Sequence, residues 1–201
     1  MGNSNFIKAA IILMFAVLIA AFTVFLSFGL SNKITPTGRS GQELTGKTAP
    51  GFTAPLVNGD FVNLSDYKDS IVVLNFWASW CPPCRTETPT IEKLWKKYRE
   101  QNVVMLGINV QDGFKTSIEY IDEFAVTFPN GLDLDGNITV NYGVTGIPVT
   151  FFIDKNGIII SRWVGSITEI KLESIILDLL NEFDENILEN GENPEGIRKL
   201  K

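Results

Sequence analysis

The segment IVVLNFW at residues 71–77 constrains the fold of this chain more than any other stretch. It is a continuous run of mainly β-branched and aromatic side chains, in which Asn75 is the one polar residue. A strand with one face in water alternates apolar and polar residues, whereas a continuous apolar run is typical of a strand covered on both faces. The segment therefore predicts a central strand in a sheet that is packed on both sides.

The rest of the chain alternates helical and extended patterns. The expected elements are, in order, a helix at 82–99, a second buried strand at 103–110, a helix at 116–125, a short helix near 139–144, a hairpin of strands at 149–154 and 158–164, and a last amphipathic helix that carries Leu172, Ile176 and Leu179. This order predicts an α/β fold in which helices cover both faces of a mixed sheet.

Both cysteines of the chain, Cys81 and Cys84, follow the first strand at the spacing C-x-x-C. A structural disulfide is poorly placed here, since closing so short a loop stabilises a protein by about 2 kcal/mol, against about 4.7 kcal/mol for a 100-residue loop. A zinc site is disfavoured too, because such sites normally need four thiolate or imidazole ligands and the chain has no histidine and no third cysteine. Reversible dithiol/disulfide exchange is the remaining interpretation.

The expected strand-to-helix junction gives the two cysteines different tasks. A thiol attacks as the thiolate, and the amide donors and partial positive charge at a helix start favour that anion. We therefore expect Cys81, at the junction, to be the nucleophile. Cys84 lies one helical turn further along the same face, where it would resolve the mixed disulfide that Cys81 forms.

The N-terminal part of the chain has a different character. The stretch from Ala9 to Leu30 carries no charge and is long enough to cross a bilayer as a helix. We expect a membrane anchor at 1–30, a Ser/Thr/Gly/Pro-rich linker at 31–50, a redox domain at 51–181 and an acidic tail at 182–201.

The net charge of −6 disfavours nucleic acid as a partner. The positive residues near the span, one before it and three after it, are a weak indication against export of the domain.

The motifs NFWASWCPPCRTETP, GIPVTFFIDKNG and RWVG together resemble the membrane-anchored TlpA/ResA-like thiol-disulfide oxidoreductases, over about residues 46–181. This resemblance implies the thioredoxin fold, with no metal and no cofactor. It also implies that the proline matched by Pro148 is cis and packs beside the cysteines, so that Ile147 and Pro148 contact the bound substrate chain.

Two further residues near the cysteines gain an interpretation from the resemblance, and Trp80 gains one from its position next to Cys81. Glu87 matches an acid in the active-site helix of the family, which tunes the thiol pKa values and relays a proton during exchange; without the family, an exposed helix carboxylate is the alternative. Asn75 stands where thioredoxins have a buried aspartate, and it cannot take up a proton. Trp80 is expected to form a platform over the nucleophile, with simple aromatic packing as the alternative.

Several functions remain open at this stage. The resemblance implies a reductant for disulfides of exported proteins, for example the haem-site cysteines of apocytochrome c, recharged by a membrane thiol-disulfide carrier. The protein would then be a single-pass protein of the cell membrane with its redox domain on the extracytoplasmic side. A disulfide-forming oxidase is the first alternative. A thiol peroxidase is disfavoured, because its P-x-x-x-T-x-x-C signature would need Pro and Thr where the chain has Leu74 and Ala78. A redox-inactive binding module is disfavoured by the intact cysteine pair.

Overall fold

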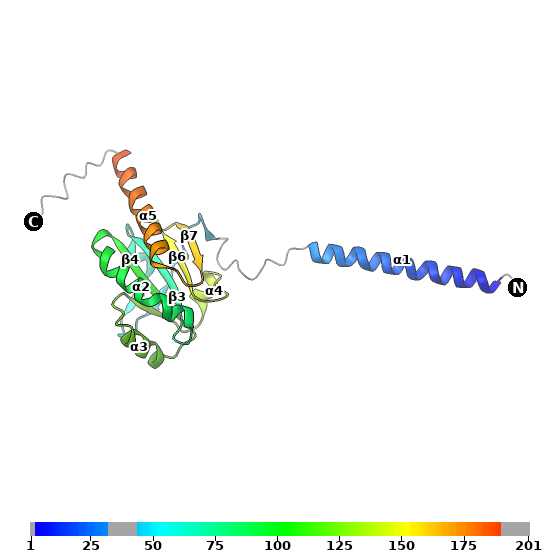
Figure 1. The fold of residues 1–201 in the computed structure, drawn as a ribbon, viewed down its shortest axis with the longest axis horizontal. Coiled ribbons are helices and arrows are strands. Elements are labelled where there is room, and N and C mark those ends of the chain that lie inside the picture. The colour runs from blue at the N-terminus through cyan, green and yellow to red at the C-terminus, as the bar shows by residue number, and fades with distance from the viewer. Residues whose placement is uncertain (1–2, 32–43, 190–201) are drawn as a thin grey trace, which may run out of the picture. The chain divides into compact units, whose positions relative to one another are not determined.

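The computed structural model describes residues 3–31 and 44–189, which belong to two separate units. The first unit contributes one helix, α1 (Asn3–Ser31), seen in Figure 1. The structure describes side chains of α1 at residues 7–8 and 11–24, and over the described residues no helix is long and apolar enough to cross a membrane. The span predicted at residues 9–30 therefore stays a prediction, and most of the predicted linker lies outside the described residues.

The second unit is built on a five-stranded mixed sheet with the order β5-β4-β3-β6-β7. β3 lies at its centre, parallel to β4 and antiparallel to β6, while β5 is parallel to β4 and β7 is antiparallel to β6. The strands are β3 (Ile71–Trp77), β4 (Val103–Val110), β5 (Asn130–Asp133), β6 (Val149–Ile153) and β7 (Ile159–Val164). A separate antiparallel hairpin pairs β1 (Thr53–Pro55) with β2 (Phe61–Asn63).

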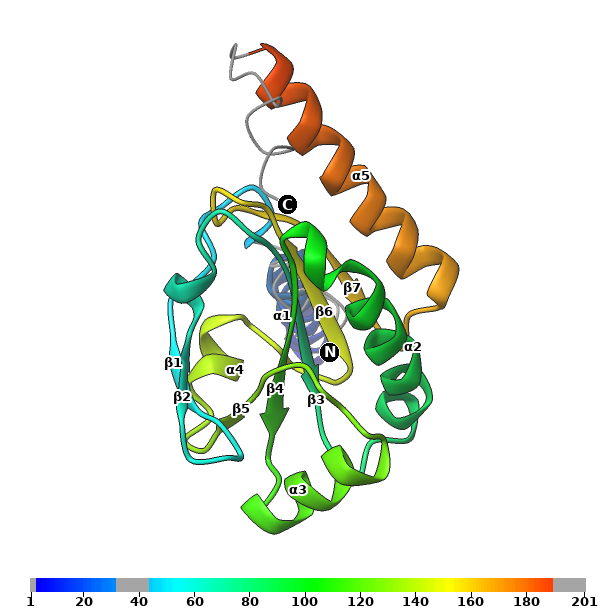
Figure 2. The same cartoon turned by 90° about the vertical axis from the view of Figure 1, so that its left-hand side faces the viewer.

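The helices of this unit are α2 (Pro82–Tyr98), α3 (Phe114–Glu123), α4 (Asn137–Asn141) and α5 (Glu169–Glu189), with short 3-10 helices at Leu64–Tyr67 and Arg99–Gln101. α2 and α5 cover one face of the sheet, and Figure 2 shows α4 and the β1–β2 hairpin on the other. The mixed α/β sheet of the thioredoxin fold is thus confirmed. One face is covered by a helix together with a hairpin rather than by helices alone.

The apolar residues of β3 explain why both faces are covered. Val72, Leu74 and Phe76 point into the core beneath α4 and the hairpin, whereas Ile71 and Val73 point into the core beneath α2 and α5. Successive strand residues face opposite sides of a sheet, so a run that is apolar at every position needs a core on each side. β3 is buried along its whole length, as the sequence predicts.

The limits of the redox domain and one strand differ from the sequence prediction. The domain begins before residue 51, because residues 44–50 pack on the β7 side, where the backbone N–H of Gly46 donates to Ile159 O (2.8 Å) and that of Ala49 to Gly157 O (2.8 Å). β5 was not predicted at all. The predicted acidic tail begins inside α5, which continues to Glu189, and residues 190–201 lie outside the described residues.

Candidate active site

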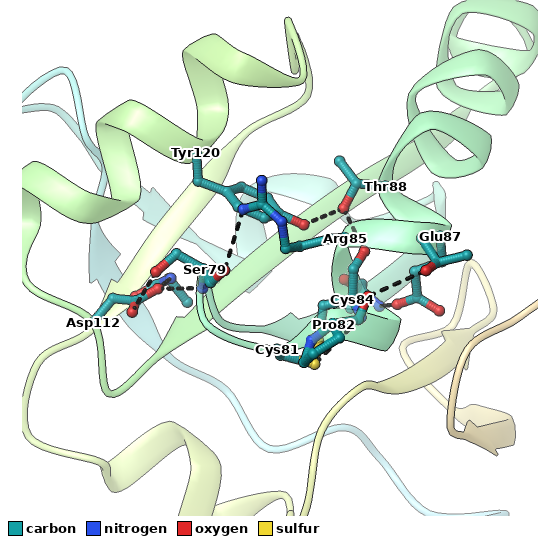
Figure 3. The surroundings of a disulfide bond; sticks show 12 residues. Ser79, Cys81, Pro82, Cys84, Arg85, Glu87, Thr88, Asp112 and Tyr120 are labelled. Carbon is teal, nitrogen blue, oxygen red and sulfur yellow. Dashed lines mark hydrogen bonds between the residues drawn. A yellow bond between two sulfur atoms is a disulfide. The ribbon is translucent and has the colours of Figure 1, made fainter.

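The cysteine pair lies where β3 ends and α2 begins. Cys81 is the N-cap of α2, and its Sγ accepts a hydrogen bond from the backbone N–H of Cys84 (3.3 Å). Pro82 and Pro83 occupy the first two helical positions, where the missing amide donors cost nothing. Cys81 and Cys84 form a disulfide with their Cα atoms 5.3 Å apart (Figure 3). The helix start therefore directs a donor at one sulfur of the redox pair.

The disulfide is almost closed to solvent. Cys81 is 2% exposed and Cys84 is fully buried, in a small cluster with Trp77, Ala78 and Tyr120. The neighbouring Trp80 is 58% exposed, so it does not pack into this cluster as a core residue. Simple aromatic packing of Trp80 is thus contradicted. Cys81 is the less buried member of the pair, so we expect a partner to reach it before Cys84.

The loop before β6 lies against the same cluster. The Ile147–Pro148 peptide bond is cis, as the resemblance implies, and Ile147 packs against the cluster that holds both cysteines. Pro148 O accepts a hydrogen bond from the backbone N–H of Gly165 (2.8 Å), which fixes this loop to the turn after β7. The structure thus brings Ile147 to the cysteine pair, with Pro148 beside it in the chain, although more than 60 residues separate them in the sequence.

Glu87 lies on α2, three residues after Cys84, and is 1% exposed. Its Oε1 accepts a hydrogen bond from Asn75 Nδ2 (2.9 Å), and its Oε2 accepts one from the backbone N–H of Ile167 (2.8 Å). Burial raises the pKa of Glu87 from 4.5 to about 7, while the bonds from Ile167 and Asn75 act in the opposite direction. The alternative of an exposed helix carboxylate is wrong, because β3 and the turn before α5 enclose this side chain.

A second set of contacts holds the loop that carries Trp80 and Cys81, and sequence reasoning missed it. The Asp112 carboxylate accepts from Ser79 N–H (2.6 Å) and from Ser79 Oγ (2.9 Å). Arg85 donates to Ser79 O (3.3 Å), forms an ion pair with Glu123, and lies over the Tyr120 ring, 5.6 Å from its centroid. Figure 3 shows Ser79, Arg85, Asp112 and Tyr120 around the start of α2. These partners come from α3 and the loop before it, so no local pattern could have indicated them.

α3 also contributes to the wall behind the disulfide. Tyr120 stacks on Trp77 with ring centroids 4.3 Å apart and shares a hydrogen bond with Thr88 on α2. Burial raises the pKa of Tyr120 to about 12, so its hydroxyl group stays protonated at physiological pH. Trp77 in turn donates from Nε1 to Asn130 Oδ1 on β5 (2.8 Å). The strand, the active-site helix and α3 are thereby joined around the two cysteines.

Comparisons with known proteins agree with this geometry. The AhpC/TSA family model matches residues 45–162. ResA, a thiol-disulfide oxidoreductase of Bacillus thuringiensis subsp. konkukian, is 34% identical over 131 residues, which cover 65% of this chain and 76% of ResA. The chain belongs to the AhpC/TSA family, as a ResA-like thiol-disulfide oxidoreductase.

Two further proteins similar to this ResA-like chain are named as thiol:disulfide interchange proteins. The thiol:disulfide interchange protein DsbE of Pseudomonas fluorescens biotype C is 38% identical over 131 residues, covering 64% of this chain and 71% of DsbE. A crystal structure provisionally assigned as DsbE, from Chlorobium tepidum, has a TM-score of 0.64 and 34% identity, and the match covers 68% of this chain and 97% of that one. The thioredoxin fold and the enzyme class predicted from the sequence are thus confirmed.

The peroxidase alternative gains no support from the site of this ResA-like chain. The two positions that the peroxidase signature requires are occupied by Leu74 and Ala78, both fully buried. Neither side chain has a hydroxyl group, so no threonine is available at this point to hold a peroxide near Cys81.

Proposed function

We propose that this protein reduces disulfides of exported proteins, with Cys81 as nucleophile and Cys84 as resolving cysteine. The Cys81 thiolate attacks one sulfur of a substrate disulfide, forms a mixed disulfide and releases the other substrate sulfur as a thiol. Cys84 then loses its proton and attacks Cys81 Sγ, which releases the second substrate thiol. Two electrons pass to the substrate, and the enzyme is left with the Cys81–Cys84 disulfide that the structure contains.

The observation that carries the proposal is the buried carboxyl group of Glu87, one turn beyond Cys84 on the active-site helix. The second step needs a base for the Cys84 proton, and Cys84 has no access to bulk water. A carboxyl group whose pKa is raised to about 7 by burial exchanges protons near neutral pH, as a general base for a thiol requires. We assign this role to Glu87.

The proposed substrate contacts lie around Cys81, the less buried cysteine of the pair. Trp80 offers an exposed ring next to Cys81, and Ile147 packs against the cysteine cluster, with the cis bond to Pro148 following it. We propose that these three residues contact the substrate chain around its disulfide. The haem-site cysteines of apocytochrome c are the example that the family resemblance implies, and a membrane thiol-disulfide carrier would return electrons to Cys81 and Cys84.

We further propose that residues 9–30 anchor the protein in the cell membrane, with the redox domain on the extracytoplasmic side. The support is in the sequence: the uncharged stretch from Ala9 to Leu30 rises about 1.5 Å per residue as a helix, which is enough for the hydrocarbon core of a bilayer. Substrates with stable disulfides occur mainly in oxidising compartments outside the cytoplasm. A C-terminal reporter enzyme that is active only in the cytoplasm would refute this orientation.

Two measurements test the proposed role of the protein as a disulfide reductant. The Cys84→Ala variant cannot complete the second step, so it should accumulate mixed disulfides through Cys81, which mass spectrometry of non-reduced complexes would identify. The Cys81/Cys84 couple should have a potential near that of thioredoxin, about −270 mV, or below it. A potential near that of the oxidant DsbA, about −120 mV, would instead support the disulfide-forming oxidase.

A further inference from the structure

The Glu87 carboxyl group is held by two donors, and one of them is a side chain that substitution can remove. The backbone N–H of Ile167 bonds Oε2, and Asn75 Nδ2 bonds Oε1. Asn75 lies in the middle of β3, is 4% exposed and makes no covalent or capping contribution to the active-site helix. Its contact with Glu87 is therefore separable from the geometry of the cysteine pair.

Thr150 on β6 fixes the orientation of the Asn75 amide. The two residues are register partners across β3 and β6, and Asn75 Nδ2 also donates to Thr150 Oγ1 (3.0 Å). The two hydrogens of one amide nitrogen are thus shared between a hydroxyl oxygen and a carboxylate oxygen. All three side chains are buried, so water does not compete for these bonds.

We propose that Asn75 is a positioning residue of the exchange reaction, which holds the Glu87 carboxyl group at the active-site helix and favours its charged form. The amide nitrogen donates to the carboxylate and adds no charge of its own. An aspartate at this position would add one, and two adjoining carboxyl groups compete for a single proton. This inference rests on the proposed role of Glu87.

The test follows the Glu87 carboxyl group directly by ¹³C NMR of the oxidised full-length protein with labelled glutamate carboxyl carbons. The Glu87 signal is assigned by its loss in Glu87→Gln. Asn75→Ala removes a hydrogen-bond donor to the Glu87 carboxylate. In this variant the pH midpoint of the Glu87 carboxyl titration should therefore rise by about one pH unit. Thr150→Val, which keeps a β-branched side chain in the strand, should give a smaller shift in the same direction and serves if Asn75→Ala does not fold.

Asn130→Ala is the matched control, since Asn130 is a buried asparagine on a neighbouring part of the sheet that bonds Trp77 and not Glu87. Its Glu87 midpoint should equal that of the wild type. An unmoved midpoint in Asn75→Ala and Thr150→Val, or an equal shift in Asn130→Ala, overturns the inference about Asn75 alone. Exchange by Glu87→Gln at the wild-type rate would overturn the role of Glu87 itself.

Discussion

Each half of α2 buries one glutamate, and the two glutamates have different hydrogen-bond and ion-pair partners. Glu87, in the half that follows the cysteines, is held by the amide of Asn75 and the backbone N–H of Ile167. Glu92, in the other half, pairs with Lys96 (2.9 Å) and accepts from the backbone N–H and hydroxyl group of Thr127. Burial alone does not make a carboxyl group useful for proton transfer. What distinguishes Glu87 is that its described partners are neutral.

This difference separates a structural end of the helix from a chemical one. Lys96 compensates the Glu92 charge, and Thr127 ties the helix to the segment before β5. The Glu87 charge has no cation in contact among the described residues, so its proton is held until the pH approaches 7. Substitutions at matched positions in the two halves should therefore affect different properties.

The largest contrast is expected at the cysteine end itself. Cys81→Ser should reduce exchange with a disulfide-bonded peptide to the uncatalysed rate, because a serine hydroxyl is no nucleophile for sulfur at neutral pH. Glu92→Gln, in the other half, should exchange at the wild-type rate. Stopped-flow or quenched-flow detection of peptide thiols measures both variants. Residual catalysis by Cys81→Ser would show that Cys84 is able to start the reaction.

The two glutamates provide the next contrast. Glu87→Gln removes the base for Cys84 and should slow resolution of the mixed disulfide by about 10²-fold, the lower range for a general acid/base group. Glu92→Gln should leave this rate unchanged and lower the free energy of unfolding by about 1 kcal/mol, because it loses an ion pair with a half-exposed lysine. Single-turnover kinetics and denaturant unfolding check the two expectations. Equal effects of both variants on resolution would abolish the distinction between the two halves.

The pH dependence of stability sharpens the same comparison. The pKa of Glu87 is about 7 in the folded oxidised protein and 4.5 as the ordinary value. The folded state therefore binds more protons between these values, and the free energy of unfolding falls as the pH rises through this window. Relative to Glu87→Gln, the wild type should lose about 3 kcal/mol of its free energy of unfolding between pH 4.5 and 8. A flat difference between wild type and Glu87→Gln would contradict the raised pKa.

Two tryptophans near the ends of α2 give the smallest effects on exchange. Trp80 is exposed beside Cys81, while Trp95 packs on the core between α2 and α5. Trp80→Ala should raise KM for the peptide a few-fold with little change in thermal stability. Trp95→Ala should lower the free energy of unfolding by about 2 kcal/mol and leave KM unchanged. An unchanged KM in Trp80→Ala would remove this residue from the proposed substrate contacts.

The sequence predicted what local patterns encode. The strands at 71–77 and 103–110 and the helix after Cys81 follow from continuous apolar runs, helical periodicity and prolines at a helix start. β5 was missed because Asn130, Gly131 and Asp133 have low strand propensity. Gly131 is needed there for another reason: a Cβ atom at this position would lie 2.7 Å from the Cβ of Ala54 on β1.

The site was predicted in part for the same reason. The cysteine pair is a local motif, and Glu87 and Pro148 were recognised through the family resemblance. The partners that give Glu87 its raised pKa, Asn75 and Ile167, are brought to it by the sheet and by the turn before α5. Contacts between such distant segments depend on the packed fold, so periodicity and spacing carry no signal for them.

The most direct test of the account is the alkylation rate of Cys81 in the reduced full-length protein, measured from pH 5 to 9 by mass spectrometry with iodoacetamide. We predict that Cys81 reacts as a thiolate well below pH 8.5, the ordinary pKa of cysteine. The plot of its alkylation rate against pH should show an inflection near pH 7, from the titration of Glu87, in the wild type and in Glu92→Gln. This inflection should be absent in Glu87→Gln. A Cys81 that reacts as slowly as free cysteine, with the same profile in all three proteins, would contradict the account.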